Sequence, residues 1–368
     1  MPPRPRPLPR GFDDSFAVRE ARHAGVTERR LRHPSLYTPF QGVRVVSAAI
    51  APLHARAEND QARDASPTAI AARYYRAAMM LHIRAYAQNA RPAVFFSHVS
   101  AAVIWDVPLP LRVLSSAAAD LIQRGAPLAL SIEATAPLDV AVLAPLRAPR
   151  GAQVHGRQLT AAAHRVRTHD GLRVASPASM WAQMAPILTV DELIAIGDSL
   201  VNEPRLPGGR RAPAGSGLAT LTELAAALHA GRRPHAAHLR EALTHVRVGS
   251  ASKAETDLRL HLVRRGLPEP SLDIDLFDAQ GRFFGFTELA YPDYRLLIEH
   301  EGDHHRVDRG QWNRDIEKHA LATAGGWTVL RTTATQLYPN PDALITRVRE
   351  ALVRAGWPGP SPSVSRRS

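Results

Sequence analysis

The amino-acid sequence predicts a multidomain protein of mixed α/β (α+β) class, and three observations support this class. The chain has 368 residues, and at roughly 150 residues per domain this length corresponds to two or three domains. Its apolar fraction of 45% is ordinary for a globular protein. The last third alternates helix-type and strand-type apolar patterns in the order helix, strand, strand, strand, helix, strand, helix.

The composition excludes several classes of protein. No cysteine occurs, so the chain has no disulfide, thiolate nucleophile or zinc–thiolate site. No apolar run approaches the ~18 residues of a membrane-spanning helix, and we expect no membrane partner. The first ten residues, MPPRPRPLPR, are not followed by the apolar segment of a secretory signal. We therefore expect a cytoplasmic protein.

The charge balance is basic. All but two of the 46 basic residues are arginines, the exceptions being Lys253 and Lys318, and a GC-rich genome explains that preference for arginine over lysine. It does not explain the net charge of +12, which favours a polyanionic partner such as double-stranded DNA.

A small DNA-binding module is predicted near the N-terminus. Residues 1–10 are expected to be disordered, and residues 11–50 outline a winged helix-turn-helix: a helix over Ser15–His23, a glycine turn, a second helix capped by Thr27, and a β-ribbon over Leu36–Val46. The second helix would turn its arginines toward the major groove, although a solvated arginine face is about as plausible for any one of them. These candidate nucleic-acid-binding residues are Arg29, Arg30 and Arg32.

The middle of the chain has the pattern of a folded domain but no catalytic or metal-binding motif. Residues 51–201 read as a mixed α/β domain, with a long helix over residues 68–90, a helix that starts at Ser97 and a buried strand over Leu138–Pro145. The histidine that follows Ser97 is better explained by packing than by function. Residues 202–217 form a Pro/Gly/Arg linker, residues 218–250 hold connecting helices, and residues 358–368 form a low-complexity tail.

Residues 251–357 carry the informative pattern. Ser252 caps a helix from Lys253 to Arg265, and Asp278–Gly281 is a hairpin turn. The remaining elements are three strands (Ser271–Asp278, Phe283–Pro292, Tyr294–Glu301), a helix (Gln311–Ala324), a strand (Trp327–Thr333) and a closing helix (Pro341–Ala355).

Acidic residues fall at unusual places in this domain. Glu288 lies near the end of the second strand, Glu299 lies in the apolar third strand, and Glu301 shares a face with Glu299. A glutamate among Leu296, Leu297 and Ile298 loses solvation and needs a cation or a hydrogen-bonding partner.

These acids suggest a hydrolytic metal site. Converging carboxylates suit Mg²⁺ or Mn²⁺, and the candidate ligands are Glu255, Glu288 and Glu299. Such an ion activates water toward a phosphodiester. His304 and His305 follow closely and are candidates for a catalytic base or acid.

The segments TELAYP, IEHEGDHH, QWNRDIEKH and GGWTVLR, together with Glu255, resemble the uncharacterised Vsr-like (very-short-patch-repair-related) family of PD-(D/E)XK endonucleases. The resemblance covers about the last 110 residues. It implies a restriction-endonuclease-like αβββαβα domain, metal-dependent hydrolysis of DNA, and catalytic roles for Glu288, Glu299 and Glu301.

This sequence departs from the family pattern at two positions. Glu288 and Glu301 stand where the family usually has aspartate, and Glu301 occupies the spacing of the lysine of the wider fold. Lys318 is the candidate that could reach back to the acids, although a solvated helix face is the more plausible position for it. The nuclease could therefore be degenerate.

The N-terminal two-thirds resembles, more loosely, AbiEi-type antitoxin regulators, through the stretches QGVRVV, FSHVSAAVIWDVPLP and VASPASMW. Three hypotheses remain open: a metal-dependent DNA endonuclease, a non-catalytic DNA-binding transcriptional regulator, and, for the middle region, a structural or protein-interaction module whose partner could be a toxin-like protein.

Overall fold

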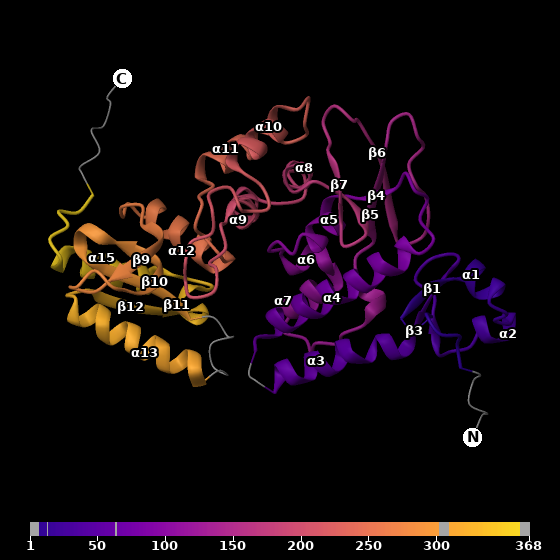
Figure 1. Ribbon diagram of the computed structural model, residues 1–368, viewed down its shortest axis with the longest axis horizontal. Coiled ribbons are helices and arrows are strands. Elements are labelled where there is room, and N and C mark those ends of the chain that lie inside the picture. The colour runs from indigo at the N-terminus through magenta and orange to yellow at the C-terminus, as the bar shows by residue number, and fades with distance from the viewer. Residues whose placement is uncertain (1–6, 13, 63–64, 302–308, 361–368) are drawn as a thin grey trace. The chain divides into compact units, whose positions relative to one another are not determined.

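The computed structural model describes residues 7–12, 14–62, 65–301 and 309–360, with only the backbone described for residue 301 and residues 309–316. The fold is mixed α/β, as predicted, and the described strands form three sheets (Figure 1). The chain divides into two compact units. The first comprises residues 1–193 and 222–240, and the second comprises residues 194–221 and 241–368.

The first unit begins with a small antiparallel sheet in the order β1-β3-β2. Its elements are β1 (Ser15–Ala17), α1 (Val18–His23), α2 (Glu28–Leu31), β2 (Leu36–Tyr37) and β3 (Val43–Val46). The prediction of a helix from Ser15 is wrong for its first three residues, because Ser15–Ala17 pairs with Val43–Val45. Phe16 and Ala17 are buried there, and strand pairing places them in the core. The ribbon and the Thr27 cap on Arg30 N–H are confirmed.

The rest of this unit contains a five-stranded sheet in the order β6-β5-β4-β8-β7, together with several helices. The predicted long helix is α4 (Pro67–Ala87), capped by Ser66, and the predicted buried strand is β5 (Leu138–Leu143). The other elements are α3 (Ala51–Gln61), β4 (Phe95–Phe96), α5 (His98–Ile104), α6 (Leu111–Leu114), α7 (Ser116–Gln123), β6 (Val154–Leu159), β7 (Val166–His169), β8 (Leu172–Ala175) and α8 (Pro177–Gln183). The helices α9 (Val190–Val201), α10 (Leu221–His229) and α11 (Ala236–His245) have residues in both units, α10 only its first residue in the second.

The second unit contains a four-stranded sheet in the order β12-β11-β10-β9. The elements follow one another as predicted: α12 (Lys253–Arg264), β9 (Ser271–Phe277), β10 (Phe283–Tyr291), β11 (Leu296–Glu301), α13 (Arg309–Ala324), β12 (Thr328–Thr333) and α15 (Asp342–Arg354). A short helix, α14 (Ala334–Leu337), and a 3₁₀ turn at Pro292–Tyr294 were not predicted. β11 pairs antiparallel with β10 and parallel with β12.

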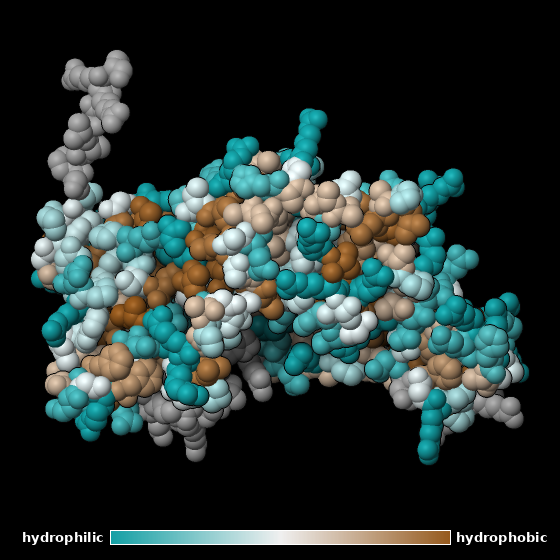
Figure 2. Space-filling view, turned by 45° about the horizontal axis from the view of Figure 1, so that its top comes forward, coloured by the Kyte–Doolittle hydropathy of each residue, from teal (hydrophilic) through white to brown (hydrophobic). Residues whose placement is uncertain are grey.

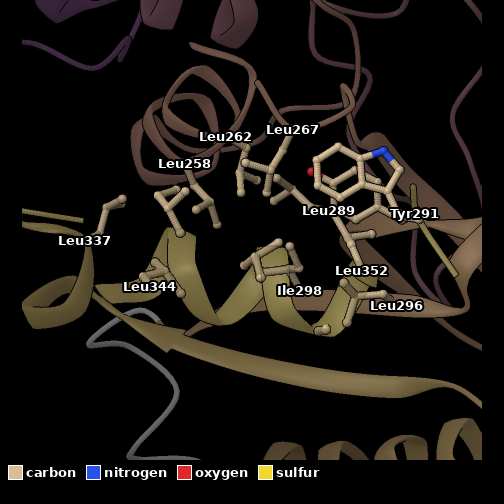
Figure 3. Packing of buried hydrophobic residues seen from close by; sticks show 14 residues of the cluster. Leu258, Leu262, Leu267, Leu289, Tyr291, Leu296, Ile298, Leu337, Leu344 and Leu352 are labelled. Atoms are coloured by element: carbon tan, nitrogen blue, oxygen red, sulfur yellow. The ribbon is translucent and has the colours of Figure 1, made fainter. Parts of the chain in front are cut away.

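Helices cover both faces of this sheet. On one face, leucines of α12 and α15 pack against Leu289, Leu296 and Ile298, as Figure 3 shows. On the other face, Ala322 of α13 packs with Ala290 and Leu297. Neighbouring residues of one strand therefore enter different cores, as the two-residue period of a strand requires. Glu288 and Glu299 lie at the ends of these apolar runs.

The segment expected to be a linker, residues 202–217, makes specific contacts within the second unit. Arg205 and Arg211 form an isolated antiparallel bridge, which makes residues 205–211 a small turn. Arg205 stacks over the ring of Phe286 at 4.5 Å and forms an ion pair with Asp273, with Nε to Oδ1 at 2.7 Å. This turn therefore lies along β9, the edge strand of the sheet.

Among the described residues, no helix has both the length and the apolar character that crossing a lipid bilayer requires.

Candidate functional site

Two of the predicted acids come together where β10 and β11 separate. The last paired residues of these strands are Leu289 and Ile298, and Glu288 and Glu299 are the next residue of each strand. The backbone N–H of His300 donates a hydrogen bond to Oε2 of Glu288 at 2.9 Å. The end of strand pairing thus frees a backbone donor that holds the Glu288 carboxylate near β11.

Glu255 approaches from the first turn of α12. The Ser252 hydroxyl accepts the Glu255 N–H at 3.2 Å, and the Ala251 N–H donates to Oε2 of Glu255 at 2.8 Å. This reciprocal arrangement fixes the start of the helix. Glu255 is only 4% exposed, so the cap holds a carboxylate inside the protein.

Lys318 and His319 of α13 both contact Glu299. Nζ of Lys318 lies 2.5 Å from Oε1 of Glu299, and Nε2 of His319 lies 2.5 Å from Oε2. The side chains of Glu299 and Lys318 are 14% and 19% exposed. The expectation that Lys318 occupies a solvated helix face is therefore wrong, because the buried carboxylate needs a cation. His319 was not identified from the sequence, since nothing in its spacing linked it to Glu299.

Gly285 makes room for Lys318. β10 has an irregular register between Phe283 and Gly285, and Gly285 has φ +156°, a conformation that side chains disfavour. A Cβ at this position would lie 2.9 Å from Cδ of Lys318. Nζ of Lys318 also donates to the carbonyl of Phe286 at 3.3 Å. The bulge thus lets the lysine stem cross β10 to reach Glu299.

The carboxylates perturb one another. Burial, followed by the nearby charges of Glu255 and Glu299, raises the pKa of Glu288 to about 8, although the His300 N–H and Lys318 oppose the rise. Burial also raises the pKa of Glu255. Burial works in the same direction on Glu299, but Lys318 and His319 outweigh it and hold the pKa of Glu299 below its ordinary value. The local charge is thus compensated at Glu299 and uncompensated at Glu288.

Asp273 of β9 extends this group of acids and was also missed from the sequence. Its charge contributes to the raised pKa of Glu255. Asp273 adopts φ +48°, and its carboxylate and backbone oxygen both accept hydrogen bonds from Arg205. The sequence does not indicate this role of Asp273. Its partner Arg205 lies 68 residues away, in the segment that was predicted to be a linker.

Three further predicted site residues have no side chain among the described parts of the structure. His304 and His305 lie outside the described residues, and for Glu301 the structure describes only the backbone, which pairs with Thr333. Within the described residues, no three histidine or acidic side chains form a group that could hold a metal ion.

The donor chemistry of the site nevertheless suits a divalent cation. Glu255 and Glu288 are carboxylates with raised pKa values, and a cation beside them would relieve their repulsion. Glu299 has its two oxygens against Lys318 and His319. An ion held by Glu299 would therefore have to share it with, or take it from, Lys318.

The predicted DNA-binding arginines lie on a single helical turn or just beyond it. Arg29 and Arg30 belong to α2, which has four residues, and Arg32 follows it as the C-cap. Arg29 and Arg32 are exposed, whereas Arg30 is half-buried and donates to the Ser35 hydroxyl at 3.0 Å. Figure 2 shows hydrophilic side chains gathered over the region of α1 and α2. A recognition helix of one turn offers little surface to a groove.

Comparisons with protein-family models, with curated proteins and with solved structures find no match for this chain.

Proposed function

We propose that residues 251–357 form a nuclease-like domain of PD-(D/E)XK type that hydrolyses phosphodiester bonds of double-stranded DNA with Mg²⁺ or Mn²⁺. The observation that carries this proposal is the meeting of Glu288, Glu299 and Lys318 where β10 and β11 separate. Two acids and a lysine from different elements, half-buried at the end of a sheet, form the group that this chemistry uses.

Each residue would have a defined task. Glu288 and Glu299, supported by Glu255, would hold the ion, which when bound supplies positive charge for the developing phosphorane oxygens and for an attacking water. Lys318 would donate a hydrogen bond to a non-bridging phosphate oxygen once it leaves Glu299. His319 would keep the Glu299 carboxylate in its orientation. Glu301, His304 and His305 follow on β11 and beyond it, and the histidines are candidates to protonate the leaving oxygen.

A plasmid-nicking assay tests this proposal. The full chain should convert supercoiled plasmid to open circles with Mg²⁺ or Mn²⁺ but not with EDTA, and Glu299→Gln should abolish the conversion. Glu350→Gln is the matched control, because Glu350 is exposed on α15. Nicking that survives Glu299→Gln would show that the activity comes from elsewhere, and no nicking by the wild type would remove the enzymatic claim.

A second function is favoured by one observation. Each oxygen of Glu299 already has a partner, an ion pair with Lys318 at Oε1 and a hydrogen bond with His319 at Oε2, as expected for a charge-balanced structural network. On this alternative the chain is a non-catalytic DNA-binding regulator of antitoxin type, with a toxin-like protein as a further partner. Wild type and Glu299→Gln would then bind duplex DNA equally, without nicking, and the binding would weaken steeply with salt.

A further inference from the structure

Two aromatic side chains are exposed together at one end of the β9–β10 hairpin. Phe277 is 54% exposed and Phe283 is 41% exposed, and their ring centroids lie 6.0 Å apart at an interplanar angle of 69°. They face each other across the strands, since Phe277 and Phe283 are paired in register. Large aromatic side chains normally bury most of their surface, so an exposed pair at one place indicates a contact surface.

The turn between the two rings is well supported. The Asp278 carboxylate accepts hydrogen bonds from the backbone N–H groups of Gln280 and Arg282, both at 2.9 Å. The Arg282 guanidinium also pairs with Asp278 at 2.7 Å. A single aspartate therefore fixes the backbone of the turn, and the rings are presented by a preorganised hairpin.

The 205–211 turn extends the same surface. Gly209 packs on the ring of Phe283, where a Cβ would lie 3.0 Å from Cζ, and Leu206 is 37% exposed. We use the name aromatic tip for Leu206, Phe277 and Phe283.

Arginines surround the aromatic tip. Arg282 and Arg211 have side chains 76% and 53% exposed, and Arg210 is exposed without an ion-pair partner in the described part of the chain. Arg211 lies 3.5 Å from Asp275. The acids nearby, Asp275 and Asp278, are thus already engaged by arginines, and Arg210 is left to meet an outside anion.

We propose that the aromatic tip stacks on unpaired bases of a nucleic-acid strand while Arg210 and its neighbours contact the phosphates. Aromatic rings next to arginines form the usual platform for single strands, because every base has a π-face and every nucleotide a charge. The inference rests on the proposed function: Phe283 and Glu288 lie on the same strand, about 16 Å apart at ~3.3 Å per residue. It names an unpaired, frayed part of double-stranded DNA as the part of the substrate that would reach the acids along β10.

Binding of a fluorescein-labelled 20-nucleotide oligo(dT) to the full chain in EDTA tests the proposal without any cleavage. The double variant Phe277→Ala/Phe283→Ala should weaken binding by about tenfold to a hundredfold, with the slope of log affinity against log salt unchanged. Arg210→Ala should lower that slope by about one. Val353→Ala, which shortens a 53% exposed side chain on α15, is the matched control and should bind as wild type.

A leucine variant separates stacking from apolar docking. Phe277→Leu/Phe283→Leu keeps an apolar surface without the rings, and it should bind oligo(dT) nearly as weakly as the alanine variant. Unchanged affinity in the alanine variant, or full affinity in the leucine variant, overturns the proposal. A wild-type dimer that both double variants convert to a monomer would assign the tip to contacts between copies instead. Because EDTA blocks metal chemistry, the result is independent of whether Glu299→Gln affects nicking.

Discussion

The ammonium of Lys318 lies 2.5 Å from Oε1 of Glu299, and it reaches that oxygen only because β10 bulges at Gly285. The contact joins the helix α13 to the strand β11 at the point where the acids gather. It neutralises one buried carboxylate and leaves Glu288, beside it, without a full counter-charge. The proposed chemistry and the stability of this corner of the sheet therefore depend on the same ion pair.

Removing Lys318 should destabilise the protein strongly. In Lys318→Met the Glu299 carboxylate stays buried with only His319 as partner, and breaking a largely buried pair costs about 2–4 kcal/mol. Arg354→Met provides the comparison, since the side chains of Arg354 and Glu350 are 69% and 59% exposed in their pair and a surface pair contributes less than about 1 kcal/mol. Urea unfolding measures both. Equal losses of unfolding free energy would contradict the burial of the Glu299 pair.

Gly285→Ala should displace the same lysine without removing it. The new Cβ would come within 2.9 Å of Lys318 Cδ, so we expect a loss of about 1–3 kcal/mol from overpacking and backbone strain. Gly281 also has a positive φ, at +76°, but a Cβ there would meet open space. Gly281→Ala therefore reports the effect of backbone strain without a steric clash. If the two variants lose the same unfolding free energy, steric contact with Lys318 contributes nothing.

The sequence predicted the C-terminal element order because each element carries a local signal: the Ser252 cap, the turn at Asp278–Gly281 and the apolar run of β11. It also selected Glu255, Glu288 and Glu299. It misplaced Lys318 and missed His319, Asp273 and Arg205, because the position of these four depends on pairing across 19 to 68 residues. Helix periodicity shows which face of α13 is apolar, but it does not show that a bulge on another strand admits a lysine.

The stability of the wild-type protein should fall as pH rises through the neutral range. Glu288 binds its proton more tightly in the folded state, where its pKa is about 8, than at its ordinary value of 4.5. Above pH 4.5 the unfolded chain gives up this proton while the folded protein keeps it, so unfolding free energy decreases with pH until about pH 8. Glu288→Gln, which can still accept the His300 hydrogen bond, should remove on the order of 2 kcal/mol of this decrease.

Urea unfolding at pH 5, 7 and 9 measures this dependence. Glu255 has a raised pKa as well, so the variant should retain part of the slope. Glu299 has the opposite effect on the pH dependence of stability. Because its pKa is lowered, it stabilises the folded protein above its ordinary pKa, and this stabilisation is lost as the pH falls below that value. A parallel pH profile for wild type and Glu288→Gln would show that Glu288 titrates normally.

Binding of a divalent cation should release a proton. At pH 7 a carboxyl with a pKa of about 8 is protonated in roughly nine molecules of ten, and a metal ion takes the carboxylate form. Calorimetric titration with Mn²⁺ in two buffers of different ionisation enthalpy, PIPES and Tris, should therefore report close to one proton released per ion at pH 7 and almost none at pH 9.5. Glu288→Gln should release clearly less at pH 7, because only Glu255, whose pKa is also raised, can still give up a proton. Heat without proton release in the wild type would place the ion away from Glu288, and the absence of any binding heat would leave the non-catalytic regulator as the better description of this chain.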